Sequence, residues 1–453
     1  MKKRLQKIII GALVVVVLIG ALIFLNLSTP GETPQDQGIR FFAPEKSWQD
    51  VKSIFIENYY SSYTIVFGDD GYTIDAAENL PLDLERLSSS RYFFGRLNAQ
   101  FVVDDGEGSA VYGLDAPRAT VTLTYTSGQT LKLILGSTVN TGTYVQVVGE
   151  SSIYFFSTAQ AEPFFWEPRA YVSRVVTGRM TGIIFERAVF EGNVRPEPVM
   201  LEPNPERELS GVDYLVVLPR HRVAGRAAGI LTSLSDIRAL EVAYLFPDER
   251  TIEFFGLSSQ EAYSVVTIEW EGNMVVFTAS EPTATGHFYM MTSWLPVIYF
   301  MDSSPYNNEF PLLWYESLYQ DFLSTFILNP VFDSLSEIEI ATQAEVHTFV
   351  LSGRGNYVSD ATNGRQIDFE TFYPLFRLLA TAPNEGFFEE ELPSGVAHIM
   401  TITYRYADTG RADSILAFYE FAPRRAVGVL DLYPEAIIRT GYLEEIIAFL
   451  IDL

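Results

Sequence analysis

The 453-residue chain contains no cysteine and only four histidines. The lack of cysteine excludes disulfide bonds, thiolate metal ligands, catalytic thiols and anchoring through an acylated cysteine. The four histidines lie far apart and form no His-x-x-x-His pair on a helix, so a zinc site would need long-range convergence. We therefore expect surface or hydrogen-bonded histidines, and neither a metal site nor a cofactor, at His221, His287, His347 and His398.

Several sequence motifs of enzymes are also missing. The chain has no Gly-x-Ser-x-Gly elbow, and no Gly-x-x-x-x-Gly-Lys loop for nucleotide phosphates. The acidic loop with Asp104, Asp105 and Glu107 lacks the ligand spacing of an EF-hand, so it is expected to be a solvated loop and not a calcium site. We expect that the protein is not an enzyme. An envelope hydrolase with two carboxylates stays an alternative, because spatial separation and not sequence identifies such pairs.

Charge is strongly unbalanced toward the acidic side. The formal net charge is −26, and Lys2, Lys3, Arg4 and Lys7 all precede the first apolar segment. The rest of the chain therefore repels polyanions, and we expect no nucleic acid as a partner.

One long apolar segment begins at Ile8 and ends at Leu25. At 1.5 Å per residue it is long enough to cross the hydrocarbon core of a bilayer, so the lipid bilayer is its expected partner. The preceding positive charges predict a single-pass protein of the cell membrane with a cytoplasmic N-terminus and an extracytoplasmic body. A cleaved signal peptide is the rival interpretation, although residues 22–25 offer no small-x-small cleavage site. Residues 28–38 are polar and rich in Pro and Gly, as in a tether.

The rest of the chain is expected to hold three domains. A stretch of alternating strands at 112–166 returns in altered form at 255–314. Gly113 matches Gly256, Gly142 matches Gly286, and the Ile-Tyr-Phe run at 153–155 matches that at 298–300. Because the matches keep their order and their separations grow slowly, they indicate an ancient duplication. The expected segments are the cytoplasmic tip and anchor 1–26, tether 27–47, and domains 48–178, 179–329 and 330–453.

The predicted fold class is α+β. One N-terminal transmembrane helix would precede three tandem repeats, each an antiparallel sheet of a hairpin and a meander with one packed helix. In the first repeat the helix is expected at 82–98, and in the second at 223–240. The third repeat is more divergent: residues 369–380 occupy the helix position, with Pro374 expected to shorten or kink it, and a last helix is expected at 443–453.

Residues 112–145 resemble domain-of-unknown-function family 4340. The resemblance rests on a Tyr-Gly-Leu-Asp-x-Pro turn, the strands that follow, and a later glycine and tyrosine. The second repeat departs from it with Ser258 and Gln260, and the third lacks the turn, while the repeats extend the resemblance over about 48–453. The residues that carry the signature, for which a structural role is expected, are Tyr112, Gly113, Leu114, Asp115, Pro117, Gly142 and Tyr144.

The resemblance implies a bacterial protein with one N-terminal membrane helix and no catalytic residue set. Similar proteins tend to be encoded near ABC-type export permeases and their auxiliary proteins. The leading hypothesis is therefore a non-enzymatic accessory or scaffold component of an ABC-type transport system, with a permease or its auxiliary protein as partner. An exposed apolar face at 305–329 is the expected contact.

A binding module for an extracellular glycan or peptide is the second hypothesis. Tyr59, Tyr60 and Tyr63, or Tyr404 and Tyr406, are aromatic residues that would stack on sugars. Because they alternate in expected strands, packing within the sheets is the interpretation that the sequence favours.

Overall fold

The computed structural model describes residues 39–69, 71–99, 101–103, 108–178, 183–303, 312–351, 357–388 and 390–453. Two compact units divide the chain, one ending at Ser173 and the other running from Arg174 to Leu453. The acidic segment 104–107, expected to be a solvated loop, and the apolar segment from Ile8 to Leu25 lie outside the described residues.

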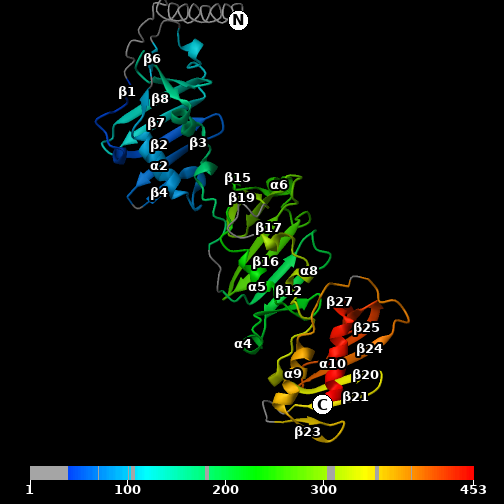
Figure 1. The fold of residues 1–453 in the computed structure, drawn as a ribbon. Helices are drawn as coiled ribbons and strands as arrows, with labels where there is room; N and C mark the ends of the chain where they lie inside the picture. Colours follow the sequence, from blue (N-terminus) through cyan, green and yellow to red (C-terminus); the bar gives the residue numbers. More distant parts are fainter. Residues whose placement is uncertain are drawn as a thin grey trace, which may run out of the picture. The chain divides into compact units, whose positions relative to one another are not determined.

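The first unit is built on an eight-stranded antiparallel sheet in the order β4-β3-β2-β7-β8-β9-β10-β6 (Figure 1). Every second residue of Ala119–Tyr125 is buried, because alternate side chains of a strand face the core. The strands are β2 (Val51–Asn58), β3 (Ser62–Gly68), β4 (Gly71–Ile74), β6 (Phe101–Val103), β7 (Ala119–Tyr125), β8 (Thr130–Val139), β9 (Gly142–Val147) and β10 (Ile153–Ser157). A separate pair joins β1 (Arg40–Phe41) to β5 (Asn98–Ala99).

Helix α2 (Leu84–Phe94) packs in the same unit, together with the short α3 (Thr158–Ala161). It begins where the Asp83 carboxylate accepts a hydrogen bond from the Arg86 backbone N–H at 2.9 Å, a typical N-cap. Leu87 and Phe94 are its buried apolar residues. The helix is shorter at both ends than the sequence predicts.

The second unit contains two large antiparallel sheets. The nine-stranded one has the order β14-β13-β12-β11-β16-β17-β18-β19-β15. Its strands are β11 (Arg187–Glu191), β12 (Val199–Pro203), β13 (Tyr214–Leu218), β14 (Arg222–Val223), β15 (Glu241–Leu245), β16 (Ser264–Trp270), β17 (Asn273–Ala279), β18 (His287–Thr292) and β19 (Leu295–Asp302). Short helices accompany it: α4 (Arg207–Ser210), α5 (Ala227–Thr232), α6 (Glu249–Phe254), α7 (Leu313–Glu316) and α8 (Tyr319–Phe322).

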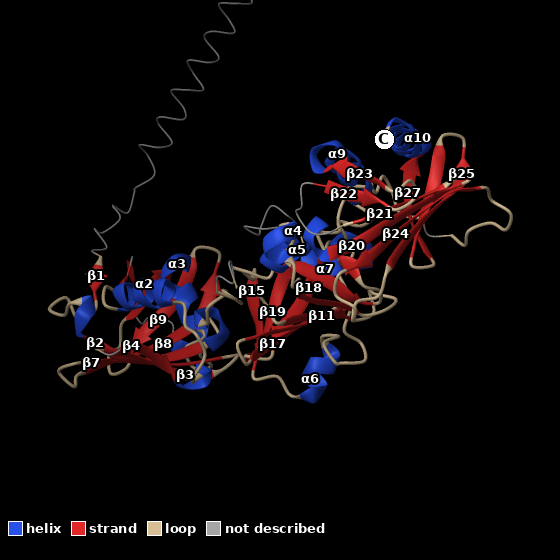
Figure 2. Cartoon of the chain, turned by 90° about the horizontal axis from the view of Figure 1, so that it is seen from below, coloured by secondary structure: helices blue, strands red, loops and turns tan. Residues whose placement is uncertain are grey.

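The other sheet of this unit has eight strands in the order β23-β22-β21-β20-β24-β25-β26-β27. Helices α9 (Phe369–Ala380) and α10 (Thr440–Asp452) both cover one of its faces (Figure 2). Phe372, Leu375 and Leu379 of α9 join its core. The strands are β20 (Leu335–Thr342), β21 (Val346–Val350), β22 (Tyr357–Asp360), β23 (Arg365–Asp368), β24 (His398–Tyr406), β25 (Ser414–Ala422), β26 (Arg425–Leu430) and β27 (Tyr433–Arg439).

The three large sheets share one strand order. In each, the first strand (β2, β11 or β20) pairs on one side with the next strand and on the other with the strand that opens a four-stranded meander. Tyr144 pairs with Phe155 in the first unit, and Tyr289 pairs with Phe300 in the nine-stranded sheet. These pairs make Tyr144 the counterpart of Tyr289. Two residues earlier on the same strands, Gly142 pairs with Ser157 and His287 pairs with Asp302. The counterpart of Gly142 is therefore His287, and the sequence match of Gly142 to Gly286 is wrong by one residue.

The helix expected at 223–240 is mostly wrong. Val223 pairs with Leu215 in the sheet, and α5 covers only Ala227–Thr232. The segment cannot continue as a helix past Asp236, whose φ of 55° is left-handed.

The predicted fold class is also wrong. The described chain is mainly β, the nine-stranded sheet has five short helices beside it, and the last sheet packs two helices and not one. Val223, which its spacing places in a helix, pairs in edge strand β14 instead. Among the described residues, no helix is both long and apolar enough to span a membrane.

Candidate functional site

The seven signature residues lie in the first unit. Five of them precede β7, and Gly142 and Tyr144 lie on β9. Gly113 has a φ of 68° and lies against Ser137, so a Cβ there would meet the Ser137 backbone N at 3.0 Å. The Tyr112 and Tyr144 rings are 4.9 Å apart edge to face, and Leu114 is buried. Gly142 packs on Phe155 and Phe156. These contacts are those of a packed turn.

Asp115 and Pro117 are the exposed members of the signature. Within the described residues the Asp115 side chain makes no hydrogen bond, so the turn is held by packing of its neighbours. The signature therefore does not bring together groups that would perform chemistry.

Three of the histidines lie beside polar side chains. His287 bonds Thr285 at 2.9 Å, His398 bonds Thr401 at 2.8 Å, and His347 lies 3.0 Å from Glu345. Within the described ranges, no three His, Asp or Glu side chains are grouped as metal ligands. His221 lines a large cavity of the second unit.

That cavity, of about 650 Å³, lies between the two sheets of the second unit. Apolar side chains from both sheets and the segment between them line it: Leu215, Val223, Leu328, Ile415, Leu430 and Leu432. Polar and charged side chains line it as well, among them Glu206, His221 and Arg411. A cavity of this size with a mixed lining is typical of ligand and partner sites. It is the strongest candidate site in the described part of the chain.

Arg222, on edge strand β14, joins the two sheets at the cavity. It is 4% exposed, and its Nε donates to Glu435 Oε2 of β27 at 2.6 Å. Its other nitrogens donate to the Leu430 and His221 carbonyl oxygens at 3.1 and 2.7 Å, and one lies 3.5 Å from Asp431. Every terminal nitrogen of the buried guanidinium thus has an oxygen partner, which offsets its loss of water.

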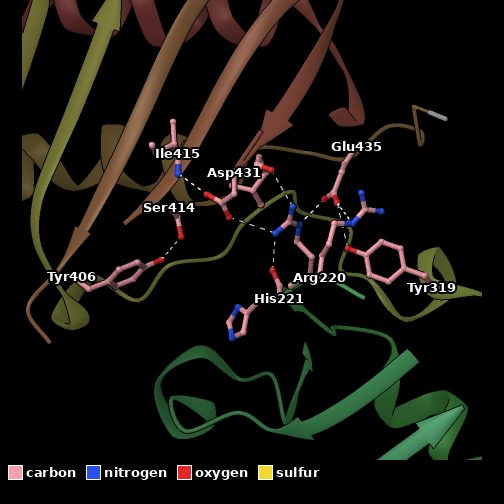
Figure 3. A network of polar contacts seen from close by, with 10 residues as sticks. Arg220, His221, Tyr319, Tyr406, Ser414, Ile415, Asp431 and Glu435 are labelled. Carbon is pink, nitrogen blue, oxygen red and sulfur yellow. Dashed lines mark hydrogen bonds and ion pairs between the residues drawn. The ribbon is translucent and has the colours of Figure 1, made fainter. Parts of the chain in front are cut away.

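Arg220 approaches the same carboxylate from the other side (Figure 3). Its Nε lies 3.2 Å from Glu435 Oε1, and its guanidinium lies 5.0 Å from the Tyr319 ring and 4.9 Å from the Tyr433 ring. Tyr319 donates to Glu435 at 3.4 Å. Burial, and then the Glu435 charge, raise the pKa of the Tyr319 hydroxyl, so it stays a donor at neutral pH.

A strained hairpin tip forms part of the cavity rim. Asp431 and Leu432 connect β26 to β27 with φ values of 51° and 76°, a conformation that usually takes Asn or Gly. Asp431 compensates by accepting the Ile415 N–H at 2.9 Å (Figure 3). The result is that Leu432, 90% exposed, is presented to solvent beside the cavity.

His221 and Arg411 supply polar groups of the cavity. Figure 3 shows the His221 ring pointing away from Arg220 and Glu435. Loss of water on its inner side, and then the positive charges of Arg411 and Arg222, lower its pKa. Arg411 pairs with Glu206 at 2.7 Å and lies 3.5 Å above the Tyr406 ring. The cavity thus presents a neutral imidazole and paired charges, with no unpaired cation for an anionic ligand.

The sequence did not single out Arg222 or Glu435. They are more than 200 positions apart, and neither belongs to a motif. The only signal was local: Arg220, His221 and Arg222 form a basic run after strand β13 in a strongly acidic chain.

Comparisons with known proteins agree with part of the sequence interpretation. The model of one family, a domain of unknown function (DUF4340), matches residues 73–175. This segment contains α2, the signature turn and the meander β7 to β10 of the first unit. No curated protein and no solved structure was found to match the chain. The family resemblance is confirmed for residues 73–175; bacterial origin and an N-terminal anchor stay predictions.

Proposed function

We propose that the protein is a non-enzymatic accessory component of a cell-envelope transport assembly, which holds a partner subunit at the junction of its last two sheets. The observation that carries the proposal is the 650 Å³ cavity whose base is fixed by buried Arg222 and whose rim carries exposed Leu432. An ordered base and an accessible apolar rim favour binding, because little conformational entropy is lost when a partner docks.

The rim contains more than one apolar anchor. Ile415 is 44% exposed and Leu432 is 90% exposed, and both line the cavity. Protein interfaces concentrate their binding free energy in such anchors, surrounded by polar groups that exclude water. Glu206, Arg411 and Asp413 supply that polar surround.

The choice of an ABC-type permease or its auxiliary protein as the partner rests on the family resemblance. The proposal also includes the cellular location of the protein. The chain attaches to the lipid bilayer of the cell membrane through the segment from Ile8 to Leu25, and its acidic body lies on the extracytoplasmic side.

Of the contact expected at 305–329, only its last residues, Leu328 and Asn329, line the cavity of this proposal. Most of its described part packs into its own unit: Trp314 and Phe322 are fully buried, and Leu328 is 8% exposed. Leu313 and Leu318 keep some exposure but do not line the cavity. The proposed contact with the partner is therefore the junction cavity and not an exposed apolar face of this segment.

A peptide-binding module is the second candidate, and the same cavity favours it. Its volume falls in the range of roughly 300–1,000 Å³ typical of small-ligand sites. A short peptide suits its apolar side chains, and His221 would supply a hydrogen bond.

Cross-linking in intact native membranes tests the proposal. The full-length protein is then purified and the proteins that accompany it are identified by mass spectrometry. We expect recovery of an ABC-type permease or its auxiliary subunit. Recovery of the protein alone, at good yield, contradicts the accessory role and favours the peptide-binding function.

A further inference from the structure

The tip of the β2–β3 hairpin in the first unit carries two tyrosines that the accessory role does not use. Tyr59 is 88% exposed and Tyr60 is 64% exposed, and their rings meet edge to face at 5.4 Å. The sequence favoured packing for both, and that is wrong, whereas Tyr63, Tyr404 and Tyr406 are buried. Within the described residues, neither exposed hydroxyl makes a hydrogen bond.

Asn58 fixes this tip. Its side-chain oxygen accepts the N–H groups of Tyr60 and Ser61, each at 3.0 Å. Its side-chain nitrogen donates to the Phe164 and Trp166 carbonyl oxygens at 3.2 and 2.9 Å. One half-buried amide therefore uses both of its polar atoms to tie the tip to the segment that carries Phe165. The backbone that carries the tyrosines is held in place before any ligand arrives, which lowers the entropic cost of binding.

A cavity of about 730 Å³ adjoins the tyrosines. Arg118 lines it, lying 4.9 Å above the Phe165 ring with a 2.7 Å hydrogen bond to Thr138. Glu57 lines it as well and accepts a 3.2 Å hydrogen bond from Thr120. Each charged group is thus oriented by a neighbour, yet has further capacity, since a guanidinium has about five donors and a carboxylate about four acceptor sites.

We propose that this surface, defined by Tyr59, Tyr60, Glu57, Arg118 and Phe165, is a binding site for a neutral glycan. Sugar rings present C–H faces that pack on the electron-rich faces of aromatic rings. Their hydroxyl groups both donate and accept, which matches a carboxylate and a guanidinium in the same cavity. The two charges cancel, so the charge complementarity favours an uncharged ligand.

A peptide fits this surface less well. Extended peptides gain much of their affinity by pairing with a free strand edge. At this hairpin β2 is paired on both sides, with β3 and with β7, and Asn58 pairs with Ala119. No free edge of β2 is left beside the tyrosines for a peptide backbone.

Isothermal titration of the full-length chain with two neutral oligosaccharides tests the site. The probes are a β-1,4-linked N-acetylglucosamine tetramer and an α-1,4-linked glucose tetramer, in a detergent without a sugar headgroup. We expect one of them to bind. Y59A/Y60A is expected to weaken it about tenfold, because both aromatic contacts with the sugar rings are lost. R118M should weaken it as well, by removing hydrogen bonds while leaving the tyrosines in place.

The matched control is Y92A, which removes a half-exposed tyrosine of α2 outside the site (47% exposed). The affinity of Y92A for the oligosaccharide should equal that of the parent protein. The unfolding midpoint of Y59A/Y60A should stay within about 2 °C of the parent's, since exposed substitutions change stability little. Absence of binding to both probes overturns the proposal. So does binding that survives Y59A/Y60A, or a tyrosine-dependent interaction found only with peptides.

Discussion

At the residue scale, Arg222 connects two sheets that are far apart in the sequence. It is 4% exposed and Glu435 is 9% exposed, so both charges have left water. Burial of such a pair contributes little net stability, but removal of one partner leaves a buried charge without its counterion. The pair is therefore expected to fix the geometry of the junction more than to stabilise the fold.

The variant R222M is expected to lower the free energy of unfolding of the second unit by about 3 kcal/mol. The loss should stay at the lower end of the usual range for buried pairs, because Arg220 remains 3.2 Å from Glu435. Hydrogen exchange should rise in β14 and β26. The control R238M removes a residue whose side chain is 65% exposed, and should leave exchange unchanged. Equal effects of the two variants would show that the junction does not depend on Arg222.

The pKa of His221 gives the junction a pH dependence. Burial, and then Arg411 and Arg222, lower this pKa in the folded state. The unfolded chain therefore binds a proton where the folded chain does not. Stability should fall as the pH drops through the ordinary histidine range near about 6.5.

NMR titration of the His221 imidazole checks this prediction, with the urea midpoint measured on both sides of that range. H221Q should show a smaller loss of stability in acid than the parent protein. An imidazole that titrates at or above the ordinary value would contradict the assigned influence of the two arginines.

At the element scale, the turns before the meanders recur in two sheets. Gly113 and Gly256 have nearly equal φ values of 68° and 67°. Their surroundings differ, since a Cβ on Gly113 would clash with Ser137, whereas on Gly256 its nearest neighbour is Ser280 Cβ at 3.6 Å. Both turns need the left-handed conformation, but only the first is also crowded.

G256A is accordingly expected to cost about 1–2 kcal/mol, the price of left-handed backbone for alanine. G113A should cost more, because steric overlap adds to the same strain. Chemical denaturation of each variant measures the two values. A cost of G113A no larger than that of G256A would mean that the Ser137 loop moves aside freely.

Local patterns predicted individual elements better than they predicted the fold. Residues 369–380 were expected as a helix, and α9 has these bounds despite Pro374, with Asp368 capping its first turn at 3.4 Å. The segment 223–240 has helical spacing as well, but Val223 enters a strand because an edge of the sheet is available to it. Spacing alone does not reveal such competition from distant strands.

At the scale of the whole molecule, the site residues were the hardest to predict. Arg222 and Glu435 meet only after two sheets have folded and packed. Tyr59 and Tyr60 were expected to pack within a sheet, and the hairpin turn that Asn58 holds places them outside it. The signature residues, by contrast, were expected to be structural, and their contacts are those of packing.

The most direct test of the account is site-specific photo-cross-linking in native membranes. Leu432 and Phe254 are each replaced by p-benzoylphenylalanine in the full-length protein; both positions lie in the second unit and are 90% and 83% exposed. If the junction holds a partner subunit, position 432 should give a defined adduct with a transport protein and position 254 should give none. Adducts from position 254 alone, or from neither position with the protein intact in the membrane, would contradict a partner site at the junction.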